Sequence, residues 1–564
     1  MAEKLGSLAA PDVLDKFLRK AKPAELYKLL TSITTYHRVQ GSSEIVEAAK
    51  KVVEWAHARG LNVEFDVVRG CVCLDREWFF WEPMGWELKN AELEVRESNG
   101  WRCVVSTDDH PLVAVVHSPA GVVEGRAGFG NSDIVVRIDE LGYWEAVEEN
   151  VAAIVVSHWG PGIRYFAVFP PCNAKQPRVP ALSIPNSVLG KIVGRQVRVS
   201  VDAEYTEHVM PLVRIRIGEI GGPQIVVVAH ICHPTPGAHD NASGVVAALG
   251  VAKLLTAYEQ LLVEKGVGVT VMLVPEHTGT AYTLSKSIVD PKTIIAGLSL
   301  DMVGANLGKT GGSLLLLSSL YSLPSPLDPL LYTTLWNSFS QRGHGTTSYP
   351  TEPLYIQPYD AGSDHDILVS YGIPASMINE WPDKYYHTSL DEPSNIDMHR
   401  LAKIVASVAT SIVLLVDSLS QVGELLNTWK NYIVYSNHLH SIALPHDNLE
   451  TLSKLLDRGV NATLYRIEEI FGKTVQHVPW EANVEIRRRG TISKRWLKLQ
   501  ADSEYQELLR LENEEESMYL KLAPLVLQAT RSIEAAKLEL VARTGKRVDE
   551  ELLDKVLSLV SRRS

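Results

Sequence analysis

The sequence is poor in several features that mark particular classes of protein. It has 5 cysteines among 564 residues, an odd number, and Cys71 and Cys73 are too close together to form an easy bridge. A disulfide scaffold is therefore not expected, and a reducing compartment is the simpler interpretation. The longest apolar run, residues 404–416, falls short of the roughly 20 residues that span a bilayer. Residues 1–12 contain no apolar core of signal-peptide length. We expect a soluble cytoplasmic protein with no membrane partner.

The sequence also lacks the excess of positive charge that is typical of nucleic-acid-binding proteins. Lys plus Arg number 55 and Asp plus Glu number 67, so the net charge is −12. This balance argues against a chain built mainly to bind nucleic acid or an anionic membrane. The basic cluster at Arg487–Arg489, Lys494 and Arg495, next to Trp496, is therefore interpreted as a solvated loop or hairpin face.

Three common catalytic motifs are absent. There is no H-E-x-x-H and no G-x-S-x-G, which excludes the single-zinc helix pattern and the nucleophile elbow. The stretch from Gly304 to Thr310 is one residue too short between its glycines for a phosphate loop.

The chain divides into four regions of different texture. Helical spacing dominates residues 1–66, short β-rich runs fill 67–205, strands alternate with helices in 206–420, and 421–564 is mostly helical and charged. The alternation in the third region predicts an α/β domain. The last region is typical of packing or self-association, so a homo-oligomer is left open. In the second region strands are expected at 102–106, 112–118, 133–138, 152–157 and 196–205.

Each predicted strand of the third region ends in residues that can bind metal or move protons. These are His230 after 225–229, Glu276 and His277 after 269–274, Asp301 after 294–300, and His387 after 375–378. In open α/β sheets, sites form beyond the carboxyl ends of the strands, so these side chains should converge. Asp240, in GAHDNASG between a strand and a helix predicted over 241–262, could be shared by two cations. Imidazole and carboxylate without thiolate suit zinc, manganese or cobalt.

Each residue alone has a plainer interpretation. A histidine at a strand end is more often a hydrogen-bonded structural residue than a ligand, and an aspartate before a helix is usually a cap. The prediction therefore rests on the joint constellation at one sheet edge. Cys232 is assigned to packing or to the surroundings of the ligands.

The sequence resembles the co-catalytic di-zinc aminopeptidases, metallopeptidase family twenty-eight, over roughly its first 420 residues. The matching segments, in the family's order, are IVVVAHICHP, GAHDNASG, VPEHTGT, LSLDMVG, SDHDILVSYGIPA and YYHTSLDEPSNID. The forms PEHTGT and HICHP look more like a less-studied aminopeptidase-like branch than like the secreted enzymes. The resemblance implies an α/β fold, a phosphorylase/hydrolase-like zinc-exopeptidase sandwich with a mixed central sheet. It also implies that 67–205 is an inserted, β-rich, protease-associated-like domain, before a helical C-terminal region.

The resemblance further implies two divalent metal ions, most simply zinc, with cobalt or manganese as alternatives. Asp240 would bridge them, His230 and Asp301 would complete one site, and His277 and His387 would complete the other. Glu276 would be the general base, and His233, Asp364 and His365 would lie in the surrounding shell or contact substrate. Two positions depart from the family pattern, which has a second Glu at His277 and an Asp at Cys232. Either His233 takes part in the site, or another group orients His230.

The activity expected from this resemblance is that of a metal-dependent exopeptidase. Specifically, we expect an aminopeptidase that releases N-terminal residues from peptides through a metal-activated water. A carboxypeptidase or a glutaminyl-cyclase-like enzyme on the same site is the alternative, and a non-catalytic scaffold on a peptidase fold is the third. The site segments contain Asp360, Asp364, Asp366 and Glu380 but only Lys384 as a basic residue, which favours recognition of an amine.

Overall fold

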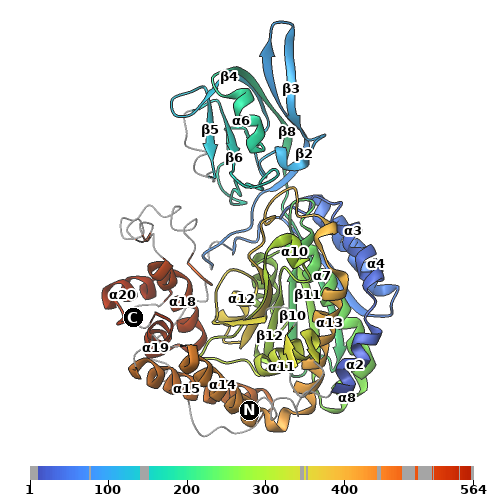
Figure 1. Cartoon of the computed structure of the whole chain (residues 1–564), viewed down its shortest axis with the longest axis vertical. Coiled ribbons are helices and arrows are strands. Elements are labelled where there is room, and N and C mark those ends of the chain that lie inside the picture. Colours follow the sequence, from blue (N-terminus) through green and yellow to red (C-terminus); the bar gives the residue numbers. More distant parts are fainter. Residues whose placement is uncertain are drawn as a thin grey trace.

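Two large β-sheets, the helices that pack on them and a two-stranded ribbon of β14 (Ser340–Arg342) and β15 (Ser348–Pro350) make up the described part of the structure, a computed structural model (Figure 1). It describes residues 11–74, 78–139, 151–342, 348–350, 354–440, 446–472, 514–544 and 546–560, together with 480, 490–492, 508 and 511. The basic cluster at Arg487–Arg489 and Lys494–Trp496 lies outside the described residues.

The larger sheet has eight strands and is mixed, as predicted. In spatial order they are β1 (Asn62–Arg69), β9 (Val209–Gly218), β11 (Gly268–Val274), β10 (Gln224–His230), β12 (Ile294–Leu300), β17 (Ala375–Trp381), β13 (Ser313–Leu317) and β16 (Leu354–Gln357). The four central strands β11, β10, β12 and β17 run parallel to one another. Strand β9 is antiparallel to β1 and β11, and β13 is antiparallel to β17. Every residue of β10, β11 and β12 is buried, which is expected of parallel strands covered on both faces.

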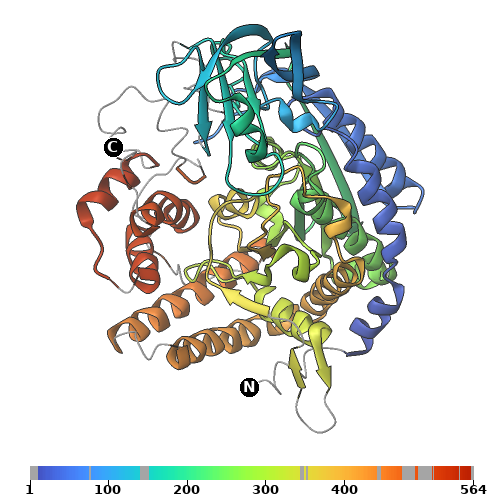
Figure 2. The same ribbon diagram turned by 45° about the horizontal axis from the view of Figure 1, so that its top comes forward.

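Helices cover both faces of this sheet (Figures 1 and 2). Alternate residues of β10 point to opposite sides, so Ile225 and Val227 join one core while Val226 and Val228 join the other. The first core is completed by α2 (Pro11–Lys20), α3 (Pro23–Ile33), α4 (Ser43–His57), α7 (Gly244–Leu255), α8 (Glu259–Glu264), α11 (Asp328–Phe339) and α13 (Met398–Asp417). The second is completed by α9 (Thr278–Ser285), α12 (His365–Ser370), α15 (His446–Ile470), α18 (Glu514–Thr530), α19 (Ile533–Thr544) and α20 (Glu550–Ser558). Helices α14 (Val422–His440) and α15 contribute to both.

The C-terminal helices thus form the second covering layer of the main sheet.

Two helical stretches, Ala238–Glu264 and Met398–Asp417, are long and apolar enough to cross a membrane by length and composition alone. In this fold 61% and 83% of their apolar windows are buried, so packing already accounts for most of that apolar surface.

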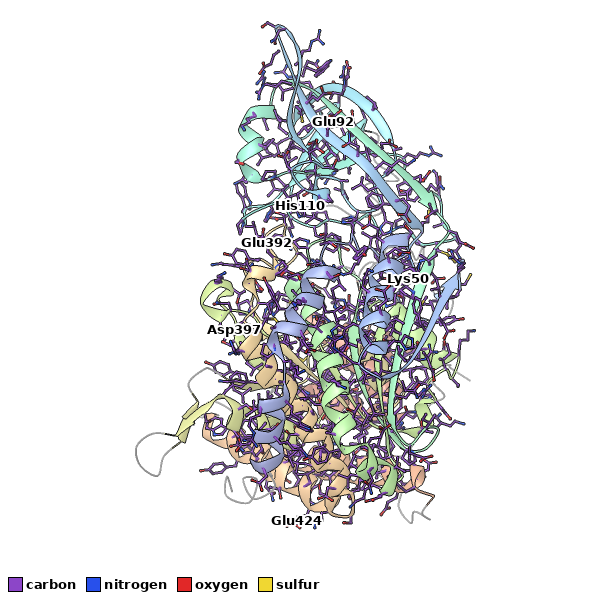
Figure 3. All side chains as sticks on the ribbon, turned by 90° about the vertical axis from the view of Figure 1, so that its right-hand side faces the viewer. Lys50, Glu92, His110, Glu392, Asp397 and Glu424 are labelled. Carbon is purple, nitrogen blue, oxygen red and sulfur yellow. A yellow bond between two sulfur atoms is a disulfide. The ribbon has the colours of Figure 1, made fainter. Side chains whose placement is uncertain are left out.

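The second sheet is inserted into the chain between β1 and β9. These two strands pair antiparallel with Arg69 opposite Val209, so the chain leaves and re-enters the main sheet at one point. The inserted strands, in spatial order, are β3 (Gly100–Ser106), β2 (Gly85–Glu97), β8 (Gln196–Thr206), β4 (Gly121–Gly128), β5 (Ile134–Ile138), β6 (Ala153–Ser157) and β7 (Ala181–Ser183). They enclose a separate apolar core with helix α6 (Asn186–Ile192). Figure 3 shows Glu92 of this sheet and Glu424 of α14 towards opposite ends of the molecule.

One prediction for the inserted region is wrong. The strand expected at 112–118 is a 3₁₀ turn over Pro111–Val113 followed by isolated bridges, because Pro111 cannot donate to a ladder and His110 caps the turn. The sequence predicted no disulfide scaffold and did not indicate the single disulfide that joins Cys71 to Cys172, which a loop of the inserted region brings beside it.

A buried carboxylate on α19 fastens the C-terminal helices to the main sheet's loops. Glu539 accepts hydrogen bonds from the backbone amides of Tyr321 (3.0 Å) and Ser322 (2.8 Å). It is fully buried and pairs with Arg543 at 3.0 Å. Its removal would leave a buried cation and two buried amides without their acceptor.

We therefore expect Glu539→Ala to lower the free energy of unfolding by about 3–5 kcal/mol, the usual cost of breaking a buried ion pair. Urea denaturation followed by circular dichroism measures this change. The matched control is Glu550→Ala, which removes an exposed partner of Lys537 and should leave the midpoint nearly unchanged. Equal midpoints for the two variants would contradict this account of the docking.

Candidate metal centre and active site

The polar residues predicted at the strand ends meet at the carboxyl edge of the parallel strands. His230 is the last residue of β10, Glu276 and His277 follow β11, and Asp301 follows β12. His387 comes from the loop after β17. All five line one cavity of about 790 Å³, together with Asp240.

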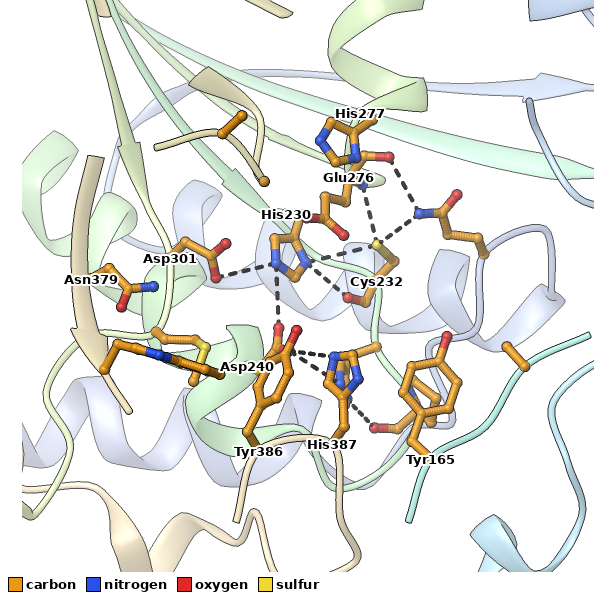
Figure 4. A pocket seen from close by; sticks show the side chains of 18 of the residues that line it. Tyr165, His230, Cys232, Asp240, Glu276, His277, Asp301, Asn379, Tyr386 and His387 are labelled. Carbon is orange, nitrogen blue, oxygen red and sulfur yellow. Dashed lines mark hydrogen bonds and ion pairs between the residues drawn. The ribbon is translucent and has the colours of Figure 1, made fainter. Parts of the chain in front are cut away.

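Asp240 lies at the centre of this group (Figure 4). One carboxylate oxygen, Oδ1, is 3.4 Å from Nε2 of His230. The other, Oδ2, is 3.1 Å from Nε2 of His387 and 3.4 Å from Nε2 of His233. Nε2 of His230 is also 3.3 Å from Oδ1 of Asp301. The result is two groups of three ligating side chains that share Asp240.

The free atoms of these groups fit divalent metal ions. Nδ1 of His230 donates to the carbonyl of Cys232 (2.9 Å), and Nδ1 of His233 donates to that of Pro234 (2.8 Å). These bonds leave Nε2 of each ring with its lone pair directed into the site, as in metal-ligating histidines. Nε2 of His233 and Oδ1 of Asp301 are buried and have no hydrogen-bond partner among the described residues. Imidazole and carboxylate donors of this kind suit zinc.

The electrostatics of the site keep Asp240 ionised. Burial alone would raise the pKa of its carboxyl, but the imidazoles of His233, His387 and His230 hold it well below its usual range. An ionised carboxylate with one oxygen directed to each group is what a shared ligand requires.

The structure places His233, and not His277, in the second group. The sequence assigned His277 as the ligand beside His387 and left His233 in the surrounding shell. His277 instead adopts a left-handed backbone conformation (φ +55°), and its amide donates to Asp364 (2.8 Å). Its ring lies 5.8 Å from that of Phe80, turned away from Asp240 (Figure 4). The signal for His233 was its spacing from His230 in His-Ile-Cys-His.

Glu276 is half-buried in the turn between β11 and α9, and its side chain extends towards His230 (Figure 4). Its backbone amide donates to the sulfur of Cys232 (3.2 Å), which anchors this turn to the loop after β10. Burial raises the pKa of Glu276 to about 7, although His230 and His277 oppose the rise. A carboxyl with that pKa can accept and return a proton near neutral pH.

Asp364 and His365 hold the loops around the site through hydrogen bonds. Asp364 accepts from the amide of His277 and from Oγ1 of Thr280, both at 2.8 Å, so it holds the turn that carries Glu276. His365 is fully buried, and its Nε2 donates to the carbonyl of Asp360 (2.8 Å). His365 does not line the cavity itself, but Asp360, whose carbonyl accepts its hydrogen bond, does.

The inserted region contributes residues to the cavity wall that the sequence analysis did not name. The amide of Tyr165 donates to the carbonyl of His387 (2.7 Å), and its ring lies 5.0 Å from that imidazole. Arg164 also lines the cavity. Tyr386 stacks on His387 at 3.8 Å between ring centroids. Tyr165 and Arg164 reach the cavity only because the inserted region packs over it, so no local sequence signal could have revealed them.

The comparisons with known proteins concern one sequence family and the fold. Residues 217–412 match the sequence model of Peptidase family M28. The fold is similar to that of a Clostridium acetobutylicum protein assigned as a peptidase, with a TM-score of 0.52 and 15% identity, covering 74% of this chain and 84% of that protein. It is also similar to BSAP, a zinc aminopeptidase from Bacillus subtilis, with a TM-score of 0.50 and 16% identity, covering 70% of this chain and 94% of that protein.

A search of the curated proteins found no significant match. The matched segment 217–412 nevertheless contains Glu276 and every residue of the two groups that share Asp240. The match to Peptidase family M28 therefore covers the part of the chain that carries the candidate site.

Proposed function

We propose that the protein is a metal-dependent aminopeptidase that uses two divalent ions, zinc in the first instance. The observation that carries the proposal is the pair of ligand groups sharing Asp240, with Glu276 beside them in one cavity. His230, Asp240 and Asp301 would hold one ion, and His233, Asp240 and His387 would hold the other. Such ions supply Lewis-acid polarisation of the scissile carbonyl and acidify water.

Glu276 has the role of proton carrier in this proposal. As a carboxylate it accepts a proton from the attacking water, and as an acid it returns that proton to the leaving amine. A pKa of about 7 makes both steps accessible at neutral pH. Asp364 and Cys232 support this role because they fix the turn on which Glu276 is carried.

A free amine at the substrate's N-terminus needs an acceptor in the cavity. The amide oxygen of Asn379 is buried, lies in the cavity wall, and has no hydrogen-bond partner among the described residues. The side chain of Asn379 is seen next to Asp301 in Figure 4. This oxygen, with the carboxylate of Asp360, supports recognition of an ammonium group.

One observation favours the carboxypeptidase alternative. Arg164 brings a guanidinium to the cavity, and no ion pair to it is found within the described part of the chain. Such a group binds carboxylates with bidentate geometry. The enzyme would then also select a substrate carboxylate, either as a carboxypeptidase or as an aminopeptidase of very short peptides.

Replacement of Glu276 tests the proton-transfer role. We expect Glu276→Gln to lower kcat by about 10²- to 10⁴-fold, because the amide cannot accept the proton, while metal content stays at the wild-type value. Elemental analysis and hydrolysis of an aminoacyl amide measure the two quantities on one preparation. Near wild-type kcat in the fully loaded variant would eliminate Glu276 as the base.

The two histidines assigned differently by sequence and structure provide a matched pair. His233→Ala should lose about one ion per chain, because it removes one of three protein ligands of a site. His277→Ala should keep the wild-type metal content, because its ring points away from Asp240. Elemental analysis after dialysis against buffered zinc distinguishes them, and loss of metal from His277→Ala alone would reverse the assignment.

Arg164→Ala separates the two substrate classes. We expect the wild type to hydrolyse an aminoacyl amide, and the variant to retain that activity. For a dipeptide with a free carboxylate, we expect kcat/KM of the variant to fall by about 10- to 100-fold, the worth of a charge-assisted hydrogen bond. Cleavage of N-blocked peptides with a free carboxylate, and none of aminoacyl amides, would establish the carboxypeptidase instead.

A further inference from the structure

Three cysteines and a glutamate gather outside the catalytic cavity, at the base of the inserted sheet. Cys71 and Cys73 follow β1, and Cys172 comes from a loop more than a hundred positions later in the chain. The sulfur atoms of Cys71 and Cys172 and a carboxylate oxygen of Glu82 lie within 4.8 Å of one another. The sulfur of Cys73 is 3.8 Å from that of Cys71.

Glu82 is held in place to face these sulfurs. It is 1% exposed, its Oε1 lies 3.2 Å from the sulfur of Cys71, and the same oxygen accepts from the backbone amide of Cys73. Oε2 accepts from the amide of Leu74 at 3.0 Å. A buried carboxylate with two backbone donors stays oriented whether or not a cation is bound.

One distance in the cluster matches that of a zinc site. Zinc–sulfur bonds of about 2.3 Å at tetrahedral angles separate neighbouring thiolates by about 3.8 Å, which is the distance between Cys71 and Cys73. Three thiolates and one carboxylate make the four ligands of a closed structural site. Soft thiolate donors also distinguish this cluster from the imidazole and carboxylate groups around Asp240.

We propose that, in the reduced protein, Cys71, Cys73, Cys172 and Glu82 bind a structural zinc ion separate from the catalytic centre. In the structure Cys71 and Cys172 are joined as a disulfide, which is the oxidised alternative of the same cluster. A dithiol reductant converts that disulfide to two thiols and is itself oxidised to a disulfide. Zinc then binds as the three thiols release their protons.

This site would brace the mouth of the catalytic cavity. The segment after Cys73 leads to Phe80 and Trp81, and the loop before Cys172 contains Phe169; all three line the cavity. These two segments are in contact, since the indole of Trp81 donates to the carbonyl of Phe169 (2.9 Å). The amide of Cys172 donates to the carbonyl of Glu82 (3.0 Å). A metal ion bound by cysteines of both segments would hold the two segments together at that end.

Cobalt substitution tests the proposal independently of enzyme activity. Neither group around Asp240 contains a thiolate, so once the reductant has been removed we expect a sulfur-to-cobalt charge-transfer band from the cysteine cluster, and its loss on replacement of Cys73 assigns it there. We expect this band when Co²⁺ is added to the reduced full chain, and its loss in Cys73→Ser. The control Cys103→Ser removes an exposed, unpaired cysteine on β3 and should keep the band. No band in the reduced wild type would overturn the proposal.

Thiol protection provides a second measurement that does not depend on how well a variant folds. In the reduced wild type, zinc should slow alkylation of Cys71, Cys73 and Cys172, while Cys103 reacts at an unchanged rate, as read by mass spectrometry. A cluster that serves only as a disulfide would show equal alkylation rates with and without zinc, and that result would also overturn the proposal.

Discussion

A buried carboxylate stays ionised only where opposite charges or metal ions compensate it, and Asp240 is the group on which this structure depends. Three imidazoles approach its two oxygens at 3.1–3.4 Å from two separate directions. Each direction holds a complete group of three ligating side chains. The sharing of one carboxylate is what turns two ordinary clusters into a single centre that can hold two cations close together.

The loop that carries Asp240 is fixed by charged groups with no direct place in the reaction. Arg38 is fully buried, and its guanidinium donates to the carbonyls of Ile231 and Gly237 at 3.0 and 2.9 Å. Asp391 accepts from the amides of His239 (2.7 Å) and Asp240 (3.0 Å). The loop is thus held by its carbonyls on one side and by its amides on the other, which limits movement of the ligands between them.

A further charged chain stands behind this loop. Burial alone would lower the pKa of His239, but the hydrogen bond with Asp383 and the carboxylate of Glu380, 3.6 Å from Nε2, raise it to about 10. The ring is therefore a buried cation, joined to Asp383 at 2.7 Å. Glu380 in turn pairs with Arg400 on α13. This chain of alternating charges connects the metal-centre loop to a core helix, so the geometry at Asp240 depends on the packing of the whole sheet.

Most of the site's position could be predicted from the sequence because parallel strands end at one edge. The polar residues after β10, β11, β12 and β17 had to meet there once these strands were recognised. The direction of a side chain in the following loop is a different matter, since it depends on backbone angles that local pattern does not reveal. For this reason His277, with a φ of +55°, points away from Asp240, and His233 occupies the position that was expected for His277.

Long-range docking explains the other omissions. Arg164 and Tyr165 reach the cavity only because the inserted sheet folds over it. The apolar stripes of the C-terminal helices predicted packing or self-association without indicating the partner surface. In the structure that surface is the second face of the main sheet. The pairing of Cys71 with Cys172 depends on the same folding of the insert and could not follow from their spacing.

The claim that Asp240 is shared by two metal ions is tested most directly by anomalous diffraction at the zinc edge from crystals of the full chain. The account predicts two peaks on either side of the Asp240 carboxylate, one reached by His230 and Asp301 and the other by His233 and His387. A single peak, or a second peak ligated by His277 in place of His233, would contradict it.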